Sequence, residues 1–93
     1  MSLTQIQSEW FYSRSIQARR RAAHRLAAVE HAEAFYQATG ATFLALASAA
    51  AAYHVSWRTV AHWRTLLRGV SESNKQERLF VLIDRNAAKA GAA

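Results

Sequence analysis

Positive charge and hydrogen-bond donors are concentrated between residues 56 and 68, a stretch that contains no carboxylate. The residues concerned are Ser56, Arg58, Thr59, His62, Arg64 and Arg68. A guanidinium offers a planar fork of N–H donors, which fits paired acceptors on a phosphate or on the major-groove edge of guanine. These residue types therefore predict recognition of a nucleic acid.

Patterns that would support catalysis or metal binding are missing from the sequence. The six acids are Glu9, Glu30, Glu33, Glu72, Glu77 and Asp84, and the four histidines are His24, His31, His54 and His62. The histidines form neither an HxxxH pair nor an HExxH motif, and the chain has no cysteine. Neither a glycine-rich phosphate loop nor a nucleophile with an evident base is present. We expect no enzymatic activity, no metal site and no cofactor in this chain.

The donors of residues 56–68 need a helix to present them, and residues 42–68 have the pattern of a helix-turn-helix. An alanine-rich helix ends near Tyr53, and His54 stands where the turn requires a positive φ. Ser56 is a good N-cap for the second helix. Such a motif places its second helix in the major groove of DNA.

The second helix of this motif is predicted to be amphipathic. Val60, Trp63 and Leu67 fall at i, i+3 and i+7 and form one apolar stripe, while Val55 fills the gap between the two helices. The opposite face is basic. A purely structural helical hairpin with solvated arginines is the alternative interpretation of the same pattern.

We expect two groups of residues to contact double-stranded DNA. Residues 56–64 enter the major groove, where Arg58 reads a base edge with help from Thr59 and His62. Phosphates are held by Arg64 and Arg68 and by a second basic cluster. The complete predicted set is Ser56, Trp57, Arg58, Thr59, His62, Arg64, Arg68, Arg19, Arg20, Arg21 and Arg25. Whether Trp57 faces DNA or packs inward is left open.

The rest of the chain is also predicted to be helical. A short helix spans residues 4–12 with Thr4 as its N-cap, and a long one runs from Ser15 to Ala38 before Gly40. The expected buried side chains in these two helices are Ile6, Trp10, Phe11, Ala22, Leu26, Val29, Ala32, Phe35 and Tyr36. Ser73 and Gln76 fit a capping box for a last helix, in which the run LFVLI (79–83) is helical because no partner strand exists.

The whole sequence accordingly predicts an all-α fold, a small helical bundle containing a helix-turn-helix. We divide it into an N-terminal segment (1–14), a helical DNA-binding domain (15–86) and an alanine-rich tail or linker (87–93). The net charge of +6 favours an acidic partner. No apolar run is long enough to span a bilayer, and no secretory signal or cysteine is present, so we expect no membrane association and a cytoplasmic location.

Three blocks of sequence resemble the DNA-binding region of phage Mu-type transposases. They are QARRRAAHRLAAVEHAEAFYQATG (17–40), ATFLALASAAAAYHVSWRTVAHW (41–63) and ERLFVLIDR (77–85). They follow the family's order with similar gaps, and the Tyr-x-Val-Ser turn of the family corresponds to residues 53–56. The likeness covers about residues 8–86 and is closest to the first of two subdomains that recognise transposon ends. Trp57 departs from the pattern because small polar residues often stand there.

This resemblance implies an all-helical, end-binding domain inside a larger transposase whose integrase-like catalytic domain lies elsewhere. Ser56, Trp57, Arg58 and Thr59 then correspond to the base-reading end, and other transposase subunits are partners only in the full-length assembly. None of the family's catalytic carboxylates has a counterpart here. The alternative is a stand-alone phage or bacterial helix-turn-helix regulator, either a repressor or a small packaging subunit. A reading frame that continues into an integrase-like domain would exclude that alternative.

Overall fold

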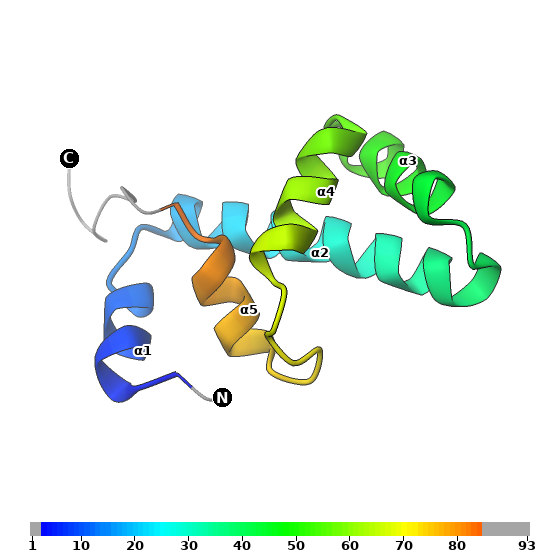
Figure 1. The fold of residues 1–93 in the computed structure, drawn as a ribbon. Helices are drawn as coiled ribbons and strands as arrows, with labels where there is room; N and C mark the ends of the chain where they lie inside the picture. Colours follow the sequence, from blue (N-terminus) through cyan, green and yellow to red (C-terminus); the bar gives the residue numbers. More distant parts are fainter. Residues whose placement is uncertain (1–2, 85–93) are drawn as a thin grey trace.

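The computed structural model describes residues 3–84, and within this range the chain forms five helices and no strand (Figure 1). The helices are α1 (Gln5–Tyr12), α2 (Ile16–Thr39), α3 (Thr42–Tyr53), α4 (Trp57–Leu66) and α5 (Lys75–Leu82). The predicted all-α fold is confirmed. The predicted tail at residues 87–93 lies outside the described residues.

The molecule is a thin slab, with principal extents of 41 × 30 × 15 Å. Its smallest dimension leaves room for about two layers of helices, whose axes pack 8–10 Å apart. A slab of this thickness has no single deep centre. The buried apolar side chains therefore fall into separate clusters, and α2, the longest helix, contributes to all three of them.

The first half of α2 packs against α1 and the end of α5. Ala18 and Ala22 contact Phe11 of α1 and Ile83, which follows α5. One turn further along, Leu26 and Val29 pack with Leu67 and Leu82. Leu67 comes directly after α4, so this middle cluster joins α2, α4 and α5.

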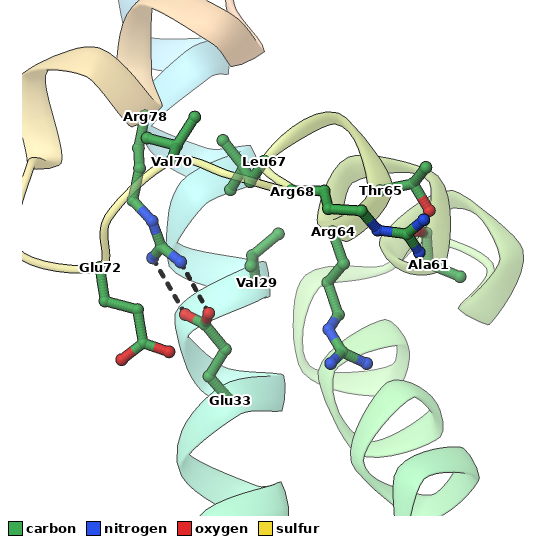
Figure 2. A pocket seen from close by; sticks show the side chains of 10 residues that line it. All are labelled: Val29, Glu33, Ala61, Arg64, Thr65, Leu67, Arg68, Val70, Glu72 and Arg78. Atoms are coloured by element: carbon green, nitrogen blue, oxygen red, sulfur yellow. Dashed lines mark hydrogen bonds and ion pairs between the residues drawn. The ribbon is translucent and has the colours of Figure 1, made fainter. Parts of the chain in front are cut away.

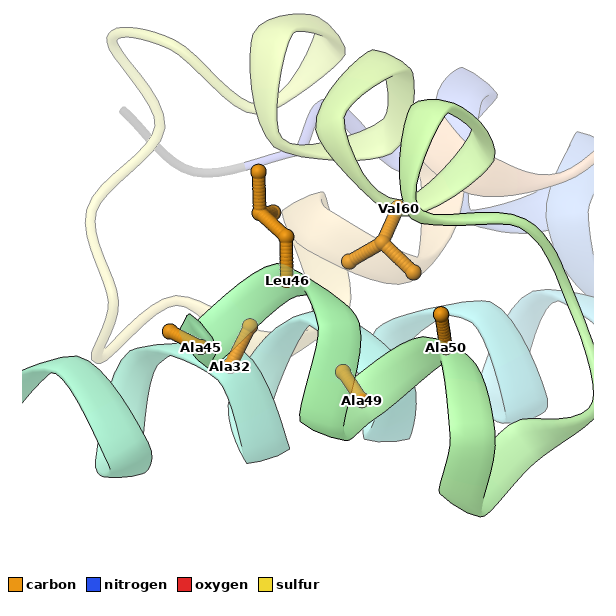
Figure 3. Close-up of a cluster of buried hydrophobic side chains, with 6 residues drawn as sticks. All are labelled: Ala32, Ala45, Leu46, Ala49, Ala50 and Val60. Carbon is orange, nitrogen blue, oxygen red and sulfur yellow. The ribbon is translucent and has the colours of Figure 1, made fainter. Parts of the chain in front are cut away.

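The second half of α2 packs against α3 and α4 through small side chains (Figure 3). The buried residues of this cluster are Ala32, Ala45, Leu46, Ala49, Ala50 and Val60. Four of the six are alanines, which let the helix backbones approach closely. Val60 is fully buried against them, and its burial contributes roughly 2 kcal/mol to stability. This cluster fixes where α4 lies relative to α3.

Local capping signals in the sequence correctly predict where most helices begin and end. The Thr4 hydroxyl accepts the Gln7 N–H as part of a capping box, and the Ser15 hydroxyl accepts the Ala18 N–H at the start of α2. Gly40 ends α2 in the left-handed region at φ 70°, and its N–H donates to the Tyr36 carbonyl over 2.7 Å. The positive φ that was predicted at His54 is confirmed at 57°.

The structure corrects three details of the sequence prediction. The last helix is capped by Asn74, whose side chain accepts the Glu77 N–H, so the predicted Ser73–Gln76 capping box is wrong by one residue. Ile6 is 79% exposed because α1 meets its neighbours through Phe11 instead. Tyr36 is also exposed, since α2 extends past the cluster formed with α3.

The amphipathic stripe predicted for α4 is largely as expected. Val60 and Leu67 are buried and Trp63 is half-buried, packed against the middle cluster. The helix itself ends at Leu66, so Leu67 is its C-cap rather than its last turn. None of the described helices combines the length and the apolar character that a bilayer crossing requires.

Close packing between α2 and α3 leads to a stability prediction. Ala49 is fully buried, whereas Ala51 on the same helix is exposed. Ala49→Leu should lower the free energy of unfolding by about 1–3 kcal/mol, because the larger side chain forces the two helices apart. Urea unfolding followed by circular dichroism measures the change. Ala51→Leu is the matched control, and equal unfolding midpoints for the two variants would contradict the packing described.

Candidate nucleic-acid interface

The start of α4 is held by a cap built from two of the predicted site residues. The Ser56 hydroxyl accepts the Thr59 N–H over 3.1 Å and lies 2.8 Å from the Thr59 hydroxyl. Before this cap, the Ala50 carbonyl accepts the N–H groups of both His54 and Val55, which closes the turn after α3. Ser56 and Thr59 thus fix the direction of the helix, and Ser56 is exposed at its tip.

The outward face of α4 carries polar side chains in a single row. Arg58, His62 and Thr65 stand at i, i+4 and i+7 and are all exposed, opposite the buried Val60 and Leu67. Thr65 was not predicted as a site residue, although its spacing from His62 would have placed it on this face. Its hydroxyl donates to the Ala61 carbonyl over 3.0 Å, so the side chain lies close to the helix.

Trp57 lies at the surface between two other side chains and does not enter the core. The residue is 39% exposed, and its ring meets the Phe43 ring of α3 edge to face, with 5.4 Å between ring centroids and 67° between planes. The Arg58 guanidinium carbon also lies 5.4 Å from the centroid of the Trp57 ring. Phe43 was not predicted as a site residue, because only the packing of α3 against α4 brings it next to Trp57.

One flank of α4 borders an open pocket with a volume of about 450 Å³ (Figure 2). Arg64 and Arg68 line it together with Glu33 of α2, Arg78 of α5 and Glu72 from the loop between α4 and α5. Within residues 3–84, Arg64 and Arg68 form no ion pair, so both cations remain available to an external anion. This flank therefore carries two of the predicted phosphate-binding residues.

One of the two acidic residues of that pocket, Glu33, forms an ion pair with Arg78. The two N–H donors of the Arg78 guanidinium reach the Glu33 carboxylate over 3.0 and 2.7 Å, and the Arg78 side chain is only 4% exposed. The hydrogen bond with Glu33, supported by the charge of the same carboxylate, raises the pKa of Arg78 above its ordinary value. The pair ties α5 to α2 and neutralises a carboxylate that would otherwise weaken anion binding.

The other flank of α4 faces an open groove of about 460 Å³ against the first half of α2. Its lining residues are Arg20, Arg21, His24, Arg25 and Trp63. Trp63 is the α4 residue that lines this groove, and it lies on the other side of the exposed row from Arg64. Cations therefore line both sides of the exposed row.

Two of the arginines in the groove also have a structural partner. Arg21 and Arg25 lie 3.1 and 2.8 Å from the two carboxylate oxygens of Asp84, and Arg25 donates to the Leu82 carbonyl. Hydrogen bonds from Arg25 and then Arg21 lower the pKa of Asp84, so the carboxylate is charged at neutral pH. With one carboxylate for two guanidiniums, this group keeps a positive charge.

The remaining members of the predicted α2 cluster differ from each other. Arg19 donates to the Arg14 carbonyl over 3.3 Å and lies over the Tyr12 ring, so it is turned toward α1. Arg20 is exposed and makes no hydrogen bond or ion pair within the described range. The structure thus gathers Arg20, Arg21 and Arg25 beside α4 and directs Arg19 away from the groove.

No family model, curated protein or solved structure matched the chain. Among residues 3–84, no group of three histidine, aspartate or glutamate side chains is arranged to hold a metal ion. The site is therefore characterised by its own geometry, an exposed helix face with cations on both flanks.

The Glu33–Arg78 pair predicts a stability effect that depends on position. Glu33→Ala leaves a buried guanidinium without its partner and should lower the free energy of unfolding by about 3–5 kcal/mol. Glu30→Ala on the same helix removes an exposed carboxylate and should change it by less than about 0.5 kcal/mol. Urea unfolding of the two variants gives the comparison. Equal losses would show that the pair does not anchor α5.

Proposed function

We propose that this chain binds double-stranded DNA and that α3, the turn and α4 act as a helix-turn-helix. The observation that carries the proposal is the exposed row of Arg58, His62 and Thr65, which has cations on both flanks and no carboxylate within α4. The major groove of B-DNA admits one α-helix, and the phosphates of the two strands then lie on either side of it. The arrangement of charge around α4 suits that geometry.

Each group of residues has a role in this proposal. Arg58 contacts a base edge, with guanine as the best fit to its fork of donors, and His62 and Thr65 face neighbouring bases. Arg64 and Arg68 neutralise phosphates of one strand, and Arg20, Arg21 and Arg25 those of the other. Ser56 and Thr59 orient the helix through the cap that they form. The chain contributes binding, and we propose no catalytic step, metal ion or cofactor for it.

The biological site that we propose is a transposon end, on the basis of the resemblance of residues 17–40, 41–63 and 77–85 to Mu-type transposases. In that role the chain works within an assembly of transposase subunits whose catalysis is carried elsewhere. The operator of a phage or bacterial regulator would engage the same face of α4. Either kind of DNA site implies a cytoplasmic location.

Salt dependence provides the test of DNA binding. Fluorescence anisotropy with a labelled random-sequence duplex, measured between about 50 and 200 mM salt, should show log affinity falling linearly with log salt concentration. A slope near −4 corresponds to between four and five phosphates, since each phosphate neutralised contributes about −0.9. Arg68→Gln should reduce the magnitude of the slope by about 1 because it removes one phosphate contact.

Lys75→Gln is the matched control, because it removes the same charge from the start of α5, away from α4. It should leave the slope unchanged if binding uses α4. Equal reductions in Arg68→Gln and Lys75→Gln would mean that only net charge matters. A flat salt response of the unmodified chain, or no binding at 50 mM salt, would rule out DNA as the partner.

A further inference from the structure

Phe43 of α3 contacts Trp57 of α4, and Trp57 in turn contacts Arg58. Phe43 is 58% exposed and belongs to the first turn of α3, yet its ring contacts the Trp57 ring at the start of α4. Arg58 lies over the same Trp57 ring. Large aromatic rings that stay this exposed contribute little to a core, so their arrangement calls for another explanation.

We infer that Phe43 and Trp57 are positioning residues that hold the Arg58 guanidinium ready to read guanine, which makes Phe43 a determinant of DNA specificity. The inference rests on the proposed function and concerns the same face of α4. Arg58 provides the contact itself, and the two rings act through it.

The geometry of a guanidinium explains how stacking and reading combine. A cation over the face of an aromatic ring is attracted by the negative charge of the ring's π electrons. Arginine has five N–H donors in a planar fork, so a guanidinium held against a ring can still present a pair of them for a bidentate hydrogen bond. A long arginine side chain otherwise loses much rotamer freedom when it binds, and a ring that already restricts it reduces that loss.

Phe43 extends this restraint to a second helix. Trp57 is the first residue of α4, where a side chain has few neighbours on its own helix. The edge-to-face contact with Phe43 fixes the Trp57 ring relative to α3, and α3 is in turn held by its alanine contacts with α2. The position of Arg58 is thereby linked to the body of the protein rather than to one helix turn.

Modified bases isolate the contact that Arg58 is expected to make. Sites are first selected by the unmodified chain from a random duplex library, and each guanine is then replaced by 7-deazaguanine, which lacks the N7 acceptor in the major groove. One replacement should weaken binding of the unmodified chain about fivefold to tenfold, because it removes part of a bidentate contact. The same replacement should have no effect on Arg58→Ala.

The same comparison tests the Phe43 and Trp57 rings. The quantity is the ratio of the affinity for the guanine site to the affinity for the same site with 7-deazaguanine. In Trp57→Leu and in Phe43→Leu, which keep an apolar side chain but lose the ring, the ratio should fall to about twofold. The salt slope should stay unchanged, because phosphate contacts are intact. Trp57→Phe and Phe43→Tyr keep a ring and should retain most of the ratio. Tyr36→Leu, which removes an exposed aromatic ring from α2, is the control and should behave like the unmodified chain.

The outcomes separate this inference from the proposed function. If the unmodified chain selects no site, or selects one with no guanine-dependent contact, the positioning role is wrong, and the salt series alone decides whether DNA binding stands. If it selects a site with a guanine-dependent contact that Trp57→Leu and Phe43→Leu leave intact, DNA binding stands and the positioning role is wrong. Equal losses in Trp57→Leu and Trp57→Phe would also overturn it, because an aromatic face would then be irrelevant.

Discussion

The small-residue contact between α2 and α3 is the constraint on which the rest of the structure depends. Ala32, Ala45 and Ala49 are buried where the two helices cross, and their size sets how closely the backbones approach. With α3 held in this way, the left-handed residue His54 turns the chain at a fixed place. α4 then packs through Val60 and presents its opposite face to solvent. The direction in which α4 presents its exposed face therefore depends on buried alanines of α2 and α3.

The arginines of this thin slab divide between structural pairing and exposure beside α4. Arg78 is buried against Glu33, and its role is to hold α5 on α2. Arg21 and Arg25 pair with Asp84 yet line the groove beside α4, so they belong to both groups. The chain has 12 basic and six acidic residues, so arginines remain in excess around α4 after these pairs have formed.

Local chemistry made much of this fold predictable from the sequence. Caps at Ser15 and Ser56 and the left-handed residues depend on neighbours within a few positions, so short patterns reveal them. The other features depend on contacts between residues that are far apart in the sequence. The Phe43–Trp57 contact and the Asp84 pairs join residues far apart in sequence, and nothing in the local pattern indicates them. The exposure of Ile6 has the same origin, since a face of α1 is buried only if another helix covers it.

DNA binding through α4 is tested most directly by titrating the isotopically labelled chain with duplex DNA and following its backbone amide resonances. We expect the largest shifts on residues 56–66 and on the α2 residues beside the groove, from 20 to 25, with small changes in α1 and the first turn of α5. Shifts concentrated on α1 and α5 while α4 stays unchanged, or no shifts at saturating duplex, would contradict DNA binding through α4.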